Sequence, residues 1–236
     1  MQKTDYKKEF IKTIDMFSGR YSKWQVWNDF LYLTAVSIAN LFPTAEKQER
    51  ESQYLEIWNK YPKELQKLFP NLIDIVAAAL TENAEQDFLG TLYHELRLHQ
   101  QQKGQFFTPY DISRFMAEIQ FCGNDTIEMS NKQYISVNDP ACGAGSLLIA
   151  FANAAKCHGI NYQTDVLFVA QDIDQTAALM CYIQLSLLGC PAIIIVGDSL
   201  LKPDFHPDNS FWLTPFYQLQ REKFQGTFVE TAASVS

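Results

Sequence analysis

The stretch YISVNDPACGAGSLL, residues 134–148, decides the fold of this chain. Its first half is apolar at Ile135 and Val137, which is typical of a buried parallel strand, and it reaches Asp139 just before a proline prevents further strand pairing. Two glycines then allow a tight turn, and Ser146 is suited to cap the helix that follows. The stretch therefore predicts a strand, an acid, a glycine turn and a helix, an order that binds ligands at the carboxyl end of a strand.

Glycine turns of this kind serve dinucleotides, phosphates and S-adenosylmethionine (SAM). A dinucleotide site requires a third small residue where this chain has Leu148, and a phosphate-binding P-loop requires a Lys-Ser or Lys-Thr pair that the stretch lacks. An acid before the turn suits the cationic ammonium of SAM better than a pyrophosphate. From these residues alone, SAM and other nucleotide-like ligands remain open.

The composition is that of a globular, acidic protein. The 236 residues are 47% hydrophobic and 14% aromatic, enough for one large domain or two modest ones. The formal net charge of −8 argues against strong unaided binding of nucleic acid, because such proteins usually carry a basic face. A basic partner remains compatible with this charge.

The five cysteines occur singly in apolar surroundings, without a CxxC pair or a Cys/His spacing typical of zinc. We interpret them as small buried thiols in a reducing compartment, and we expect no metal site. The polar N-terminus shows no secretory signal, and the apolar runs are too short to span a bilayer. A cytoplasmic protein that does not contact membranes is the expectation.

Apolar residues recur with a helical period through the first hundred residues and predict helices over 5–17, 23–41, 44–61, 72–80 and 85–99. Thr44 is the expected cap of the third. Residues 100–104 read as a solvated connection, and a further helix is expected over 111–121 with Asp111 as its cap. The residues of this helix that we expect to face inward are Ile112, Phe115, Met116 and Ile119.

After a polar loop over 123–132, strands and helices alternate. Strands are expected at 134–139, 166–170 and 192–196, with helices from 146 to 157 and from 175 to 188. Such alternation predicts an α/β protein with a parallel, three-layered sheet. Residues 225–229 could add one more strand.

Each of the three strands is followed by an acid, namely Asp139, Asp172 and Asp198. Any one of them could be a helix cap or a solvated loop residue. Because parallel strands end at one edge of a sheet, the three together with a glycine turn favour a ligand site there. The second acid could accept both ribose hydroxyls of a nucleoside, and the third an adenine amino group.

Four motifs in this order carry a family resemblance: GQFFTP (104–109), DPACGAGSLL (139–148), AQDID (170–174) and GDSL (197–200). They resemble the N6-adenine DNA methyltransferases, above all the modification subunit of type I restriction-modification systems. The segment DFLGTLYHEL before them is similar to the end of that family's N-terminal helical domain. The resemblance covers roughly residues 85–200 and implies a Rossmann-like, SAM-dependent methyltransferase fold.

The resemblance also implies roles for individual residues. The FTP segment would close over the methionine part of SAM, and the glycine loop would surround its methionine and sulfonium end. Asp172 would bind the ribose hydroxyls, Ile173 would pack on the adenine ring, and Asp198 would receive the adenine amino group. The other residues placed in the cofactor site are Phe107, Thr108, Pro109, Asp139, Ala141, Gly143 and Gly145.

The family's catalytic motif, Asn or Asp followed by two prolines and an aromatic residue, is degenerate here. Aligned after Asp208, it falls on Leu213, Thr214, Pro215 and Phe216. Leu213 cannot accept a hydrogen bond from the adenine amino group, whereas Phe216 could still stack on an extruded base. Pro215 and Phe216 are thus the remaining catalytic candidates, and a full methyltransferase sheet of about seven strands is not accounted for.

Three hypotheses follow. The first is an adenine-N6 DNA methyltransferase of the type I modification-subunit kind that reaches DNA through a specificity-type partner subunit, in a homo- or hetero-oligomer. The second is a catalytically degenerate SAM-binding protein with a regulatory or assembly role. The third is a methyltransferase for a small molecule or protein. In each case we expect a helical N-terminal domain over residues 1–100 and a SAM-binding, methyltransferase-like domain over 101–236.

Overall fold

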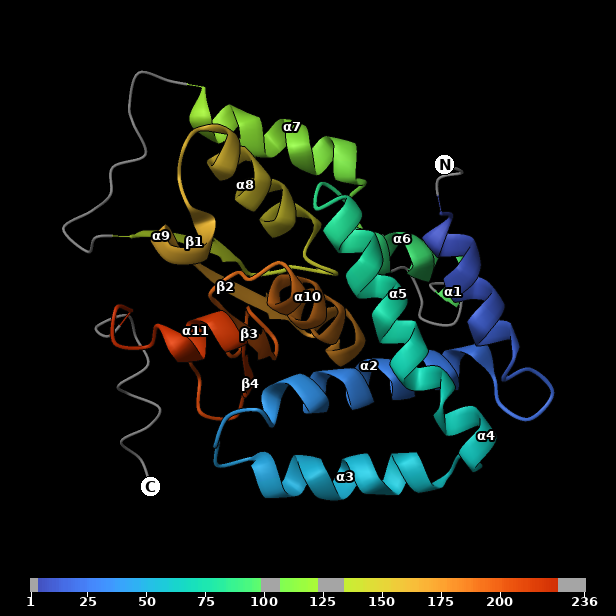
Figure 1. Ribbon diagram of the computed structural model, residues 1–236. Coiled ribbons are helices and arrows are strands. Elements are labelled where there is room, and N and C mark those ends of the chain that lie inside the picture. The colour runs from blue at the N-terminus through green and yellow to red at the C-terminus, as the bar shows by residue number, and fades with distance from the viewer. Residues whose placement is uncertain (1–3, 99–106, 123–133, 225–236) are drawn as a thin grey trace.

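The computed structural model describes residues 4–98, 107–122 and 134–224 (Figure 1). Four features expected from the sequence lie outside the described residues: the connection at 100–104, the start of the GQFFTP motif at 104–106, the loop at 123–132 and the added strand at 225–229. Among the described residues, no helix combines the length and apolar character needed to cross a membrane.

The helices predicted between residues 4 and 98 are present. The helices are α1 (Tyr6–Asp15), α2 (Lys23–Ala39), α3 (Lys47–Asn59), α4 (Lys63–Gln66), α5 (Leu68–Glu82) and α6 (Phe88–Glu95). The expectation that Thr44 caps α3 was wrong, because the helix begins three residues later with Glu46 at its N-cap. Helix α6 ends before residue 99, since Arg97 adopts a left-handed φ of 57°.

The sheet has four strands in the order β1 (Ile135–Asp139), β2 (Val166–Asp172), β3 (Ala192–Val196) and β4 (Ser210–Leu213). The first three are parallel, as expected, but β4 runs antiparallel to β3. The expected parallel sheet is therefore a mixed sheet. The physical reason is that no helix crosses over between β3 and β4, so the chain turns back at the same edge of the sheet.

Helices cover both faces of this sheet. Four helices come between the strands or after the last strand in the chain: α8 (Ser146–Cys157), α9 (Tyr162–Asp165), α10 (Gln175–Leu187) and α11 (Pro215–Leu219). Alternate strand residues point to opposite sides, so Phe168 and Ile194 join the large core under α8 and α10, whereas Leu167 and Ile193 pack towards Tyr217 of α11. Buried side chains on both sides explain the nearly continuous apolar runs of β2 and β3.

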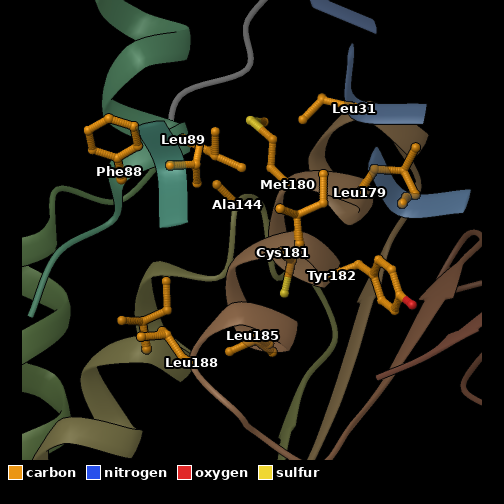
Figure 2. Close-up of a cluster of buried hydrophobic side chains, with 14 of the residues drawn as sticks. Leu31, Phe88, Leu89, Ala144, Leu179, Met180, Cys181, Tyr182, Leu185 and Leu188 are labelled. Atoms are coloured by element: carbon orange, nitrogen blue, oxygen red, sulfur yellow. The ribbon is translucent and has the colours of Figure 1, made fainter. Parts of the chain in front are cut away.

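Helix α10 links the N-terminal helices to the sheet. Figure 2 shows its buried side chains between Leu31 of α2, Leu89 of α6 and Ala144 of the glycine turn. Cys142, Cys181 and Cys190 are buried, as expected, whereas Cys122 and Cys157 are exposed, so the expectation of a buried thiol was wrong for these two. The helices and the glycine turn therefore share one hydrophobic core.

Helix α7 (Tyr110–Phe121) corrects the sequence prediction most clearly. Its buried positions are the small residues Ser113 and Ala117, which let α7 lie close against α8. The large apolar residues predicted to face inward are instead about half exposed: Ile112 52%, Phe115 66%, Met116 45% and Ile119 50%. Four apolar side chains on one helix face are thus left uncovered by the described residues.

Two predicted caps on α7 and α8 were also wrong. Pro109 stands at the N-cap of α7, so Asp111 lies within the first turn of the helix. Gly145 stands at the N-cap of α8, and Ser146 is its first residue. The Ser146 hydroxyl instead lies 2.9 Å from the Ser113 hydroxyl, and this buried hydrogen bond joins α8 to α7.

Arg50 of α3 connects strand β4 to the helical region. Its Nη2 donates to the Phe211 carbonyl at 2.6 Å, and its guanidinium lies 4.0 Å from the ring centroid of Trp212.

We expect Arg50→Met to keep the packing of the aliphatic stem and to lose about 2 kcal/mol of unfolding free energy, measured by urea denaturation. Arg20→Met, at an exposed position, should change it by less than about 0.5 kcal/mol. Equal effects of the two substitutions would contradict the proposed role of Arg50.

Candidate functional site

The glycine turn after β1 forms the centre of the site. Gly143 and Gly145 have φ angles of 54° and 92°, a left-handed conformation that side chains disfavour. Asp139 ends β1, and its Oδ1 accepts a hydrogen bond from the Ala141 N–H at 3.1 Å. Its other oxygen, Oδ2, is buried and has no hydrogen-bond partner among the described residues. The turn thus presents one buried carboxylate oxygen that can still accept a hydrogen bond.

Asp172 joins the end of β2 to this turn. Its Oδ2 accepts from the Gly143 N–H and its Oδ1 from the Asp174 N–H, both at 2.9 Å. The structure therefore brings two of the three predicted acids to the glycine turn. A carboxylate has about four acceptor positions, so Asp172 can still accept from a ligand after making both bonds.

The two acids share an electrostatic environment that disfavours ionisation. Burial raises the pKa of Asp139 above its ordinary value of 3.8, and the neighbouring charge of Asp172 raises it further against the lowering effect of the Ala141 N–H. Burial likewise raises the pKa of Asp172, and the N–H groups of Asp174 and Gly143 lower it in part. A cation bound between the acids would relieve this repulsion.

Asp198 lies after β3 at the same edge of the sheet. Its Oδ1 accepts from the Leu200 and Leu201 N–H groups at 2.9 and 3.1 Å. The neighbouring Gly197 N–H donates to the Asp172 carbonyl at 2.9 Å, which connects the two strand ends. Asp198 thus reaches the predicted edge, although a tight turn engages one of its oxygens.

Sequence analysis missed two amides that hold the loop after Asp198. Gln171 Nε2 donates to the Lys202 carbonyl at 2.9 Å, and its Oε1 accepts from the Asp204 N–H at 2.8 Å. Asn209 Nδ2 donates to the carbonyls of the same two loop residues, each at 2.8 Å. The available signal was a polar residue inside an apolar strand, because Gln171 is fully buried.

A second missed network supports the glycine turn from behind. Gln184 of α10 donates to the Ala144 carbonyl at 2.9 Å and to Asp87 Oδ1 at 2.8 Å, and it accepts from the Leu89 N–H at 3.0 Å. Burial raises the pKa of Asp87, against the lowering effects of hydrogen bonds from Gln184 and the Gly90 N–H. The network fixes the turn to α6 and α10.

Phe107 packs directly on the turn. A Cβ at Gly143 would lie 2.8 Å from Cδ1 of Phe107, so only a glycine permits this contact. The Phe107 N–H donates to His94 Nε2 at 3.3 Å, and its ring centroid lies 5.2 Å from that of Tyr93. Thr108 and Pro109 are exposed where the chain enters α7, and Ile173 is 69% exposed beside Asp172.

The proposed catalytic positions lie elsewhere. Because β4 is antiparallel, Leu213 pairs with Ile193 near the amino end of β3, whereas the acids lie at the carboxyl ends of the parallel strands. Thr214 Oγ1 accepts from the Ala192 N–H and donates to the Cys190 carbonyl, a role in the fold. Pro215 and Phe216 begin α11 at that same end. The geometry does not bring them to the glycine turn.

Metal binding finds no support in the geometry: within the part of the chain that the structure describes, no three His, Cys, Asp or Glu side chains are grouped to hold a metal ion.

Comparison with known proteins places this site in a family. A sequence profile of the family described as N-6 DNA Methylase matches residues 84–216, more than half of the chain, and includes the turn and all three acids. The chain belongs to the N-6 DNA methylase family. The match also includes the network around Asp87 and Gln184, which the four motifs do not contain.

Two curated proteins are similar to this chain. One is the Type I restriction enzyme MjaVIII methylase subunit of Methanocaldococcus jannaschii, 28% identical over 153 residues that cover 61% of this chain and 24% of the relative. The other is the Type I restriction enzyme MpnII methylase subunit of Mycoplasma pneumoniae, 36% identical over 78 residues that cover 33% and 12% respectively. The chain therefore spans at most about a quarter of the length of these relatives.

Proposed function

We propose that this member of the N-6 DNA methylase family binds SAM at the carboxyl edge of the sheet. The observation that carries the proposal is the buried Oδ2 of Asp139, which lacks a hydrogen-bond partner among the described residues and lies beside the glycine turn. A buried carboxylate oxygen of this kind requires a donor, and the ammonium group of SAM would supply one together with a positive charge. The residues present fit the cofactor.

In this proposal, each of the remaining residues contacts a different part of the cofactor. Asp172 uses its spare acceptor positions for the ribose hydroxyls, and the exposed side chain of Ile173 packs on the adenine ring. Asp198 accepts from the adenine amino group. Phe107, fixed against Gly143, keeps water from the methionine end, with Thr108 and Pro109 continuing that wall.

We propose adenine-N6 DNA methylation of the type I modification-subunit kind as the reaction in which this site takes part. Bound SAM supplies a methyl group activated on its sulfonium sulfur. The residues of this chain would bind and orient the cofactor, and the acidic net charge of −8 fits a specificity-type partner that contacts DNA. The division at residue 100 into a helical and a SAM-binding domain, and a cytoplasmic location, belong to the same proposal.

A second candidate function is a SAM-binding protein that does not methylate DNA by itself. The position of Leu213 favours it, because a leucine cannot accept a hydrogen bond from an adenine amino group and β4 carries it away from the acids. In this case the cofactor would serve regulation or assembly.

Two measurements test these proposals. Calorimetry should detect SAM binding to the isolated chain, and saturating SAM should raise its unfolding temperature; absence of both would contradict the SAM site. Transfer of labelled methyl groups to adenine-containing DNA, with the chain alone and with a co-encoded specificity subunit, separates the two functions. Methyl transfer that depends on the chain supports the first, and SAM binding without transfer in either mixture supports the second.

The raised pKa of Asp139 predicts how SAM binding depends on pH. The bound ammonium favours the ionised acid, so the pKa of Asp139 is lower in the complex than in the free protein. SAM should therefore bind with its full affinity at pH values above the pKa of Asp139 in the free protein, and the affinity should fall as the pH drops through that pKa. Because this pKa is raised, the loss of affinity should begin at a higher pH than it would for an ordinary carboxyl of pKa 3.8. Calorimetry from about pH 7 to about pH 4 measures this, with a limiting slope of about tenfold per pH unit.

Asp139→Asn provides the control for this titration. The amide keeps the shape of the side chain and cannot ionise, so affinity should be weak and the part of the slope due to Asp139 should disappear. Any slope that remains belongs to Asp172, whose pKa is also raised. An identical pH profile in the variant and the natural chain would exclude Asp139 as the ligand of the ammonium.

A further inference from the structure

Gln171 lies on the face of the sheet that packs towards Tyr217 of α11. It immediately precedes Asp172 in β2, and because strand side chains alternate, it points to the face opposite Asp172. The neighbouring side chains on that face are apolar, Val169 in the same strand and Ile195 in β3, and Gln171 is fully buried. Burial of an amide is unfavourable unless its N–H and C=O groups find partners, so the partners of Gln171 indicate what it does.

Both ends of this amide bind the loop after β3. Nε2 donates to the Lys202 carbonyl at 2.9 Å, and Oε1 accepts from the Asp204 N–H at 2.8 Å. The two residues flank Pro203, which has no N–H of its own. Asp204 has a left-handed φ of 47°, a conformation that residues with a side chain keep only where the surroundings hold them in it. The amide of Gln171 therefore fixes the loop to the end of β2.

A short series of hydrogen bonds connects this amide to Asp198. The carbonyl of Lys202 accepts from Gln171, and the N–H of Lys202 donates to the Asp198 carbonyl at 2.7 Å. The carboxylate of Asp198 uses Oδ1 for the N–H groups of Leu200 and Leu201. The position of its Oδ2 thus depends on the turn over residues 198–202, and Gln171 holds that turn through Lys202.

Asn209 holds the same loop from another side. Its Nδ2 donates to the carbonyls of Lys202 and Asp204, each at 2.8 Å. A Cβ on Gly197 would overlap Asn209 Oδ1, so the amide of Asn209 lies directly against the residue before Asp198. Two buried amides, one 0% and the other 7% exposed, therefore act on the backbone on both sides of Asp198.

We propose that Gln171 is the positioning residue for Asp198 and that it thereby makes the cofactor site selective for a purine with a 6-amino group. The inference rests on the proposed function, in which Asp198 accepts a hydrogen bond from that amino group. Hydrogen bonds weaken steeply when their geometry changes, so a carboxylate that moves with a loose loop loses this contribution. Gln171 acts through the loop, since its own side chain lies on the opposite face from Asp172.

The affinities of two cofactors test this selectivity. The probes are SAM and its 6-deamino analogue, in which hydrogen replaces the adenine amino group, each titrated into the full chain by calorimetry. The natural chain should bind SAM at least about tenfold more tightly, because the analogue leaves Asp198 without its donor. Gln171→Met keeps the length of the side chain and removes its hydrogen bonds, so the ratio should fall to about twofold, mainly through weaker binding of SAM. A ratio equal to that of the natural chain would overturn the proposal.

Gln184→Met is the matched control. Gln184 is also 0% exposed and also donates to a backbone carbonyl of the site, that of Ala144 in the glycine turn. The methionine end that this turn surrounds is the same in both probes, so the control should weaken both to the same extent and keep their ratio. An equal fall of the ratio in the two variants would overturn the proposal, because any loosening of the site would then have the same effect.

Hydrogen exchange tests the anchor without a cofactor. The N–H groups of Leu200, Leu201 and Lys202 all bind Asp198, so peptides covering residues 199–204 should exchange about tenfold faster in Gln171→Met and at the natural rate in Gln184→Met. Asn209→Ala should have the same effect and replaces Gln171→Met if that variant does not fold.

Exchange at the natural rate in both anchor variants would overturn the positioning role. Absence of SAM binding by the natural chain would contradict the proposed function and the selectivity with it, whereas faster exchange in Gln171→Met would still assign the anchoring of the loop to Gln171.

Discussion

Asp172→Ala is expected to weaken SAM binding by at least about a hundredfold. Hydrogen bonds to a charged group contribute about 1.5–3 kcal/mol each, and in the proposed site Asp172 accepts from two ribose hydroxyls. The substitution also removes the acceptor of the Gly143 N–H, at 2.9 Å in the structure, and so loosens the turn that surrounds the methionine end. Isothermal calorimetry on the natural chain and the variant measures the change.

Two further substitutions separate these effects. Asp172→Asn keeps an acceptor oxygen and loses the charge, so its loss should be smaller, about tenfold. Asp74→Ala removes an exposed acid of α5 far along the chain and should leave SAM affinity unchanged. Unchanged affinity in Asp172→Ala, with the unfolding temperature also unchanged, would show that the acid at the end of β2 is not the ribose ligand.

The acids at the strand ends could be predicted from the sequence because their position follows from local rules. A buried apolar run defines each parallel strand, and parallel strands end at one edge, so Asp139, Asp172 and Asp198 had to lie there once the strands were recognised. Their partners could not be predicted in this way. Gln171 and Gln184 act through carbonyls 31 and 40 residues away along the chain, at Lys202 and Ala144.

The hydrophobic pattern of the sequence could not predict the direction of β4. No strand was expected from periodicity at residues 210–213, where the preceding loop, held by Gln171 and Asn209, turns the chain back at the acid edge and the strand pairs antiparallel with β3. That single reversal carries Leu213 and Phe216 to the opposite edge. A motif alignment gives the order of residues and does not give the direction of the strand that precedes them.

The apolar face of α7 was misplaced because hydrophobic periodicity does not reveal which face has a partner. Ser113 and Ala117 are the buried residues, and they allow a close approach to α8 that larger side chains would prevent. Large residues on the other face then remain exposed.

Gly145→Ala is expected to destabilise the fold by about 2–6 kcal/mol. The residue has a φ of 92° at the N-cap of α8, where a side chain costs about 1–3 kcal/mol in backbone strain. An added Cβ would also lie 2.8 Å from the Cys181 sulfur and 3.5 Å from its Cα, and overpacking of a filled core costs about 1–3 kcal/mol more. Urea denaturation of both proteins measures the total.

Gly19→Ala separates strain from overpacking, because Gly19 has the same φ of 92° and no atom within 4 Å of its added Cβ. That variant should lose only the strain, about 1–3 kcal/mol. Adding Cys181→Ala to Gly145→Ala removes the crowded sulfur, so the two substitutions together should cost less than the sum of their separate effects. Equal losses of unfolding free energy in Gly19→Ala and Gly145→Ala would mean that the glycine turn rearranges to accommodate the new side chain. The close packing of the glycine turn on α10 would then not be what holds Asp139 and Asp172 together.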